Sequence, residues 1–169
     1  MKHFGGTFLE KHIINAGEVQ KFLAKQHGNA FDVSSSSLIS NLYSASLFVR
    51  HDIEKELLMN QKLSWTAMLM LYTLWVWGPS ETRIIAQRLQ LATSSVTSLT
   101  NTLEKKGLVF RTYKPKDRRL VLVNLAASGV ELLTVLSKEV NEREQALTSK
   151  LTKEEIDLFN HLLHKLLNK

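Results

Sequence analysis

The chain has 169 residues, of which 44% are hydrophobic and 22% charged, with seven glycines and two prolines. This composition is typical of a globular domain with its own core, and it excludes collagen-like and low-complexity proteins. Because the sequence contains no cysteine, disulfide scaffolds, thiolate metal sites and cysteine nucleophiles are also excluded. Lysine and arginine number 22 against 16 aspartates and glutamates, which leaves a formal net charge of +6.

The sequence predicts neither secretion nor membrane insertion. The N-terminal residues include Lys2, Glu10 and Lys11, and they lack the continuous apolar core of a secretory signal. The longest apolar run, residues 67–77, is shorter than the roughly 20 residues that a membrane-spanning helix needs. We therefore expect a soluble, cytoplasmic protein with no membrane partner.

The first third of the chain predicts two helices. Residues 8–26 carry apolar side chains at helical spacing, within an N-terminal extension over residues 1–33. The serines at 34–37 are N-cap candidates for a long helix over residues 38–58. Its leucines and isoleucine recur every three or four residues on more than one side, which is typical of a helix with several packing neighbours.

Three further helices are predicted before residue 107. Ser64 is the N-cap candidate of the first, which ends at Gly78-Pro79-Ser80, where Ser80 caps the next. A short helix follows over residues 81–89. Thr93 is the N-cap candidate of a helix over residues 94–106, and Gly107 is placed to end it.

Two strands and two helices complete the chain. Residues 108–114 and 120–125 alternate with a period of two and are predicted to form a hairpin with its tip at 115–118. A long helix is predicted over residues 129–149. Thr152 and Glu155 form a capping box that opens the last helix. The predicted fold class is mainly α with a small β-hairpin.

The helix over residues 94–106 has an unusual polar face. Val96, Leu99 and Leu103 share one side, while the opposite side carries Ser94, Thr97, Ser98, Asn101 and Lys105, with Thr93 and Ser95 next to them. Glutamate and lysine are better helix formers than serine and threonine, and they are expected on a face that only meets water. Small hydroxyls permit close approach to a DNA major groove, so we interpret this face as DNA-contacting. The alternative is an ordinary solvent-exposed face.

The whole charge excess lies in residues 105–119. This segment holds seven bases and one acid, Asp117, whereas the rest of the chain holds fifteen of each. Such clustering is typical of a polyanion site. The bases are Lys105, Lys106, Arg111, Lys114, Lys116, Arg118 and Arg119. A basic hairpin tip suits the DNA backbone or the minor groove, where arginine is favoured, and Asp117 is suited to accepting from turn amides or orienting an arginine. The alternative is a solvated, charged turn.

Residues 63–129 resemble the MarR family of winged helix-turn-helix regulators. Residues 93–109 with Arg111 look like the family's recognition helix and first wing strand. Residues 115–119, followed by Leu125 and Gly129, look like its wing. The sequence departs from the family at Ala126, where a threonine usually caps the next helix, and Ser128 is the nearest substitute.

The resemblance implies a winged helix-turn-helix lobe attached to a helical dimerisation region. It assigns residues 34–62 to an N-terminal dimerisation helix, 63–126 to the DNA-binding domain and 127–169 to C-terminal dimerisation helices. It implies an obligate homodimer on a near-palindromic DNA duplex, with Arg119 in the minor groove. The predicted DNA contacts are Thr93, Ser94, Ser95, Thr97, Ser98, Asn101, Lys105, Arg111, Lys114, Lys116, Asp117, Arg118 and Arg119.

Many family members bind small aromatic acids between the dimerisation region and the lobe. By this resemblance, Arg50 and His51 are candidates for pairing with a carboxylate. Aromatic and apolar walls are offered by Trp65, Met68, Tyr72 and Trp75. The alternative is that Trp65, Met68 and Tyr72 are core residues, because they share the inner stripe of their helix.

The predicted function is a sequence-specific, dimeric DNA-binding transcriptional repressor released by a small ligand. We expect no enzyme, cofactor or metal site, because nucleophile-elbow, P-loop and dinucleotide motifs are missing and His161 and His164 lack a third ligand nearby. Two alternatives are a winged-helix module that binds an acidic protein and a non-specific architectural DNA binder. The serine-rich helix argues against the first, since protein-binding faces are more apolar.

Overall fold

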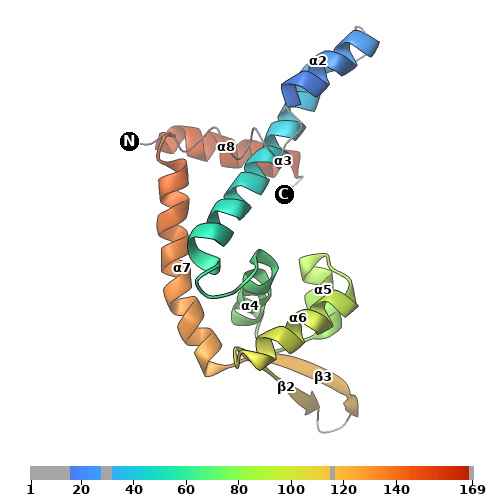
Figure 1. The fold of residues 1–169 in the computed structure, drawn as a ribbon, viewed down its shortest axis with the longest axis vertical. Coiled ribbons are helices and arrows are strands. Elements are labelled where there is room, and N and C mark those ends of the chain that lie inside the picture. Colours follow the sequence, from blue (N-terminus) through green and yellow to red (C-terminus); the bar gives the residue numbers. More distant parts are fainter. Residues whose placement is uncertain (1–15, 28–31, 115–116, 168–169) are drawn as a thin grey trace. The chain divides into compact units, whose positions relative to one another are not determined.

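The computed structural model describes residues 16–27, 32–114 and 117–167. The chain forms two compact units, Met1–Lys55 and Glu56–Lys169, which are described separately. Figure 1 shows the elements in chain order. Residues 8–15 of the first predicted helix and residues 115–116 of the predicted hairpin tip lie outside the described residues. Across the described residues, none of the helices combines the length and the apolar character that a membrane span requires.

The first unit is a pair of helices, α2 (Ala16–His27) and α3 (Val33–Ile53), that contact each other. Asp32, and not one of the predicted serines, caps α3, because its carboxylate accepts from the backbone N–H groups of Ser34 at 2.9 Å and Ser35 at 3.2 Å. The helix therefore starts before the predicted Leu38. Its predicted end at Leu58 is confirmed, although the last turn, η2 (Glu54–Leu58), is a π-helix and not an α-helix.

The second unit has the element order of a winged helix-turn-helix domain followed by two helices. Its elements are α4 (Trp65–Trp77), β1 (Ser80–Glu81), α5 (Thr82–Leu89), α6 (Thr93–Lys105), β2 (Val109–Lys114), β3 (Asp117–Leu125), α7 (Ala127–Thr148) and α8 (Lys153–Leu166). The sheet has three antiparallel strands in the order β1-β3-β2, so the predicted two-stranded hairpin gains a third strand. Ser80 in β1 pairs with Val123. The sequence does not predict β1, because a strand of two residues is too short to show a periodicity.

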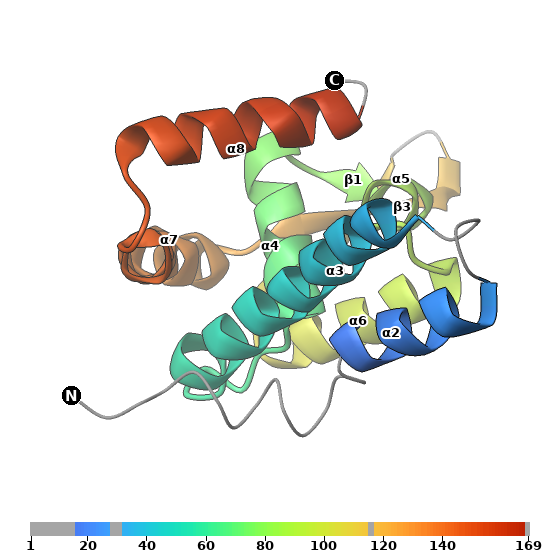
Figure 2. The ribbon, with the colours of Figure 1, turned by 90° about the horizontal axis from the view of Figure 1, so that it is seen from above.

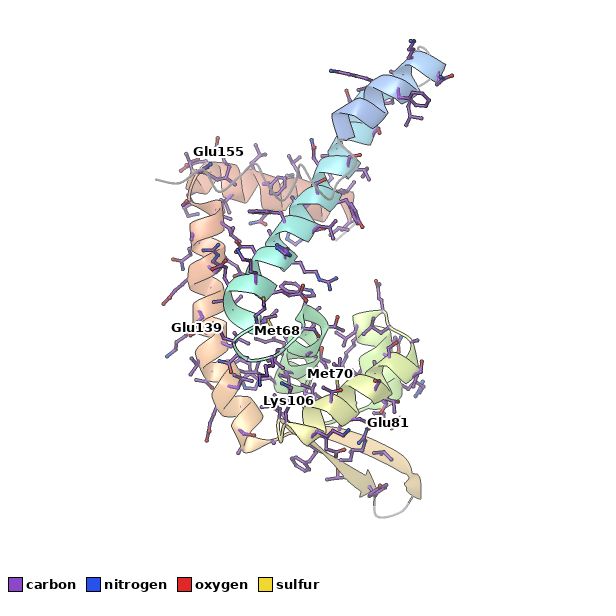
Figure 3. The ribbon with its side chains drawn as sticks, in the orientation of Figure 1. Met68, Met70, Glu81, Lys106, Glu139 and Glu155 are labelled. Carbon is purple, nitrogen blue, oxygen red and sulfur yellow. The ribbon has the colours of Figure 1, made fainter. Side chains whose placement is uncertain are left out.

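One hydrophobic core holds this unit together. Helix α4 lies at its centre and contacts α5, β3 and α7. Met68 and Met70 of α4 are labelled in Figure 3, and both are buried. The fully buried side chains include Leu71 of α4, Ile85 of α5, Val96 and Leu103 of α6, Val109 of β2, Val123 of β3 and Leu133 of α7. This apolar contact area fixes α5 and α6 relative to the sheet.

Local capping confirms some predictions and corrects others. Ser64 caps α4 by accepting from the Ala67 N–H at 3.2 Å, and Thr152 and Glu155 form the predicted capping box of α8. Ser80 does not cap α5 as predicted, because it belongs to β1. Ala92 occupies the N-cap position of α6, so Thr93 is the first helical residue and not the predicted cap.

Helix α7 begins at Ala127, two residues before its predicted start, and its N-terminus is pressed against the sheet. Gly129 is buried there, and a Cβ atom on it would lie 2.4 Å from the Leu108 carbonyl oxygen. The Ser128 hydroxyl donates to the Gly107 carbonyl at 2.6 Å, so it ties α7 to the end of α6 and does not replace the missing cap at Ala126. Beyond α7 the chain turns, and helix α8 runs crosswise to α7, away from its end (Figure 2).

Candidate nucleic-acid interface

Helix α6 is amphipathic in the predicted orientation. Val96, Thr100 and Leu103 are fully buried and anchor it to the lobe. The Thr100 hydroxyl is satisfied inside the core by donating to the Val96 carbonyl at 2.7 Å. The opposite face is solvent-exposed and carries Thr93, Ser94, Ser95, Thr97, Ser98, Asn101 and Lys105. Its small side chains leave the helix backbone open to close approach.

The hydroxyl of Thr97 is oriented by its own helix. It donates to the Thr93 carbonyl at 2.9 Å, and Thr102 does the same to Ser98 at 3.1 Å. Because a hydroxyl has a single proton, such a group presents only oxygen lone pairs to an outside partner. Thr97 therefore offers an acceptor on the exposed face.

Both ends of α6 are shaped by residues in the left-handed region. Gln90, with a φ of 53°, forms the tight turn between α5 and α6, closed by the Leu91 N–H to the Ala86 carbonyl at 2.9 Å. Gly107 has a φ of 71° and ends α6, as predicted. The chain enters β2 two residues later, so the wing follows the helix directly, and Figure 1 shows the two side by side.

A polar network joins α6 to the first wing strand. The Arg111 guanidinium donates to the Glu104 carboxylate, and the Arg111 backbone N–H donates to the same carboxylate at 3.2 Å. The other arm of the guanidinium donates to the Asn101 Oδ1 atom at 2.6 Å. Glu104 was not predicted to take part, since a separation of seven residues across a turn leaves no periodic pattern.

Lys106 also bonds within the protein. Its Nζ atom donates to the carbonyls of Lys62 at 2.9 Å and Gln61 at 3.4 Å, in the loop before α4. Lys106 is labelled in Figure 3. Lys62 itself has a φ of 52°, in the left-handed region. The bonds from Lys106 therefore support a loop that contains a left-handed residue. Among the clustered bases whose side chains the structure describes, Lys106 and Arg111 thus have partners inside the protein, while Lys105 lies exposed on α6.

The wing is formed by β2 and β3, whose register shifts near the tip. Tyr113 pairs with Val121, but the next residue, Lys114, pairs with Asp117, so β3 has three additional residues, 118–120, at this point. Asp117 and Arg118 belong to β3 and not to the predicted tip. The DNA contacts predicted for Lys114, Lys116, Asp117, Arg118 and Arg119 stay predictions.

The predicted effector residues are divided between the two units. In the second unit, Met68 is buried at 2% exposure, and the rings of Tyr72 and Trp75 lie 6.1 Å apart. Burial, with a smaller contribution from the Glu144 carboxylate, raises the pKa of Tyr72 above its usual 10.0. In the first unit, Arg50 pairs with Glu54 at 3.5 Å. A ligand site that includes Arg50, His51 and Trp65 stays a prediction.

A small-residue polar helix, held against an adjoining β-hairpin by its own side chains, is the arrangement of a winged helix-turn-helix domain. The MarR family profile matches residues 63–121. An uncharacterised HTH-type transcriptional regulator of Bacillus subtilis (strain 168), YwaE, is 36% identical over 136 residues, which are 80% of this chain and 80% of YwaE. The chain belongs to the MarR family.

Solved structures share this fold. The organohalide-sensing regulator RdhR in its 2,4-dichlorophenol-bound form matches with a TM-score of 0.71 and 21% identity, over 79% of each chain. A MarR family protein from Bacillus stearothermophilus matches with a TM-score of 0.67 and 20% identity, over 82% of this chain and 96% of that one.

Proposed function

We propose that the protein is a dimeric repressor that binds a near-palindromic DNA operator and is released by a small ligand. The observation that carries this proposal is the exposed serine, threonine and asparagine face of α6 next to a basic hairpin. Hydroxyl and amide groups hydrogen-bond to base edges and phosphates, and their small size lets a helix enter the major groove.

In this proposal, α6 lies in the major groove and the tip of the β2–β3 hairpin reaches the minor groove. Arg119 enters the minor groove, where the narrow width of A·T-rich DNA concentrates negative potential. Lys114 and Lys116 contact phosphates. These roles divide the wing into one residue that senses groove shape and two that contribute affinity on any sequence.

The test measures binding to DNA selected from a random pool, by fluorescence anisotropy at several salt concentrations. Arg119→Ala is expected to weaken binding to selected DNA more than to random DNA. Lys116→Ala is expected to weaken both equally and to reduce the salt slope by about one. Lys138→Ala, which removes the same charge from the exposed surface of α7, is the control and is expected to change neither quantity.

Two outcomes would contradict the proposal and favour another function. A specificity ratio near one would indicate an architectural DNA binder. Binding that is absent or insensitive to salt would favour a protein-interaction module.

Dimerisation is supported by the apolar face of α8. None of the residues of α8 is buried within the described chain, and Leu158, Phe159 and Leu162 are 58%, 49% and 51% exposed. Large contiguous apolar surfaces of this kind usually mark an interface. Leu162→Glu is expected to yield monomers in sedimentation velocity, whereas His161→Glu, on the neighbouring exposed position, is expected to leave the dimer intact. Monomers in the unmodified protein would contradict the proposal.

The ligand is proposed to be a small aromatic acid or phenol. The similar regulator RdhR binds 2,4-dichlorophenol in its solved structure, and Tyr72 and Trp75 offer neighbouring aromatic rings here. Titration of tryptophan fluorescence with a panel of aromatic carboxylates and phenols tests this. A ligand of this class is expected to quench the fluorescence and to weaken DNA binding, and a panel without effect on either would contradict it.

A further inference from the structure

The Asn101–Arg111 contact indicates which base this regulator recognises. We propose that Arg111 orients the Asn101 amide so that only its N–H donors face the DNA, and that Asn101 therefore selects guanine over adenine in the major groove. Arg111 acts as a positioning residue and Asn101 as the base-contacting one. This inference rests on the proposed function, in which the exposed face of α6 lies in the major groove.

The orientation of the amide follows from the chemistry of arginine. A guanidinium group carries only donors, so the Asn101 atom that lies 2.6 Å from it must be the acceptor, Oδ1. The oxygen and nitrogen are the two arms of one planar group. With the oxygen turned toward β2, the NH₂ group points away from Arg111. Since Asn101 is exposed, this NH₂ group is available to an outside acceptor.

Arg111 is itself held in place. Its guanidinium and its backbone N–H both contact the carboxylate of Glu104, one helical turn after Asn101. The side chains of this pair are 24% and 37% exposed, so water screens the pair only in part. The chain of contacts from Glu104 through Arg111 to Asn101 thus fixes the amide before DNA arrives, which lowers the entropy cost of binding.

The bases differ in what they offer to such an amide. Adenine presents an acceptor, N7, beside a donor, N6, so the usual bidentate contact of asparagine to adenine uses both arms of the amide. Guanine presents two acceptors, N7 and O6. An amide whose oxygen is already bonded to a guanidinium at 2.6 Å offers two N–H donors and matches guanine. The usual adenine contact would require this oxygen to accept from N6 with its second lone pair while it is turned toward Arg111.

The experiment selects bound DNA from a random pool, at a fixed salt concentration, with the unmodified protein, Asn101→Ala, Arg111→Met and Arg111→Lys. The unmodified protein is expected to enrich a motif with guanine at one position per half-site, and Asn101→Ala to lose the preference at that position alone. A single hydrogen bond to a base corresponds to about 2- to 12-fold discrimination, and this is the expected loss.

The arginine variants test the positioning role. Arg111→Met frees the Asn101 oxygen, so the preference at the same position is expected to move from guanine toward adenine. Arg111→Lys keeps a cationic donor and is expected to retain guanine. A purely structural role for Arg111 would weaken all positions together and leave the preferred base unchanged. Thermal melting of each variant accompanies the selection.

Each outcome decides between distinct conclusions. Adenine at the Asn101-dependent position, or a motif that Asn101→Ala leaves unchanged, would overturn the donor role. Guanine retained by a folded Arg111→Met protein would overturn the positioning role. The comparison of the unmodified protein with Asn101→Ala stands without the arginine variants, because truncating an exposed side chain leaves the core intact. If the unmodified protein enriched no motif at all, the proposed function would fail, and this inference with it.

Discussion

Replacing Gly129 by alanine is expected to destabilise the lobe, although alanine is the better helix former. Gly129 lies in the first turn of α7, where the helix meets the start of β2. An added Cβ atom would lie 2.4 Å from the Leu108 carbonyl oxygen and 2.8 Å from the Leu125 Cδ1 atom. Both distances are shorter than 3.0 Å, and Cβ atoms in proteins essentially never make contacts that short. The helix and the strand must therefore move apart.

The expected change in the free energy of unfolding combines one favourable and two unfavourable contributions. Alanine in place of glycine favours a helix by about 1 kcal/mol. Overpacking costs about 1–3 kcal/mol, and we expect the upper end because the contacted atom belongs to the backbone. The same Leu108 oxygen accepts from the Ala126 N–H at 3.0 Å, and weakening this bond costs about 1 kcal/mol. The net loss is about 2–3 kcal/mol, which lowers Tm by roughly 4–12 °C in a chain of this size.

Urea and thermal unfolding at one protein concentration measure this loss, because association with a second copy would otherwise shift the midpoint. Gly107 is the matched control, since it has a φ of 71° and open space around its Cα. There, alanine is expected to cost about 1–2 kcal/mol, and asparagine less, because asparagine tolerates the left-handed region. A Gly129→Ala protein as stable as the original would refute the close-approach argument.

Three further outcomes follow from the described contacts. Lys106→Met is expected to lower stability by no more than about 1 kcal/mol in urea unfolding, because its bonds to the carbonyls before α4 are exposed to solvent; a larger loss would contradict this. Lys62→Gly is expected to raise stability by about 1 kcal/mol in the same assay, since it relieves a φ of 52°, and an unchanged midpoint would argue against strain there. The hydrogen bond from the Ser35 hydroxyl, followed by the backbone bonds, lowers the pKa of Asp32 below its usual 3.8. The Asp32 carboxylate therefore stabilises α3 fully at pH values above 3.8, and this stabilisation is lost as the pH falls through the lower pKa of the folded state. Circular dichroism should show this loss of helix in acid. The Asp32→Asn protein should not show it, because asparagine caps a helix without titrating.

Much of the fold was predictable because it depends on local chemistry. The α6 face was predicted correctly, since the burial of Val96 and Leu103 and the exposure of Ser94 and Ser98 follow directly from helical periodicity. Gly107 and the Thr152 capping box were likewise confirmed, because each depends on contacts within a few residues.

Errors arose where contacts join distant segments or where two local choices compete. The strand β1 forms only because Ser80 pairs with Val123 on β3, 43 residues later in the chain. Asp32, and not one of the four serines at 34–37, caps α3, because its charged carboxylate accepts from two backbone N–H groups at once. Ser128 was expected to act as a cap, but its hydroxyl instead bonds to Gly107, a residue 21 positions earlier.

The amino-acid sequence alone sets the concentration of the whole net charge of +6 in residues 105–119, and it places a small polar helix face directly before a basic hairpin. How these groups are used depends on the packing of the folded chain. This packing joins Lys106 to the loop before α4 and Arg111 to Glu104 and Asn101. A count of charges cannot distinguish a base that is free to meet a phosphate from one that already has a partner, because that partner is set by the packing of α6 against the wing.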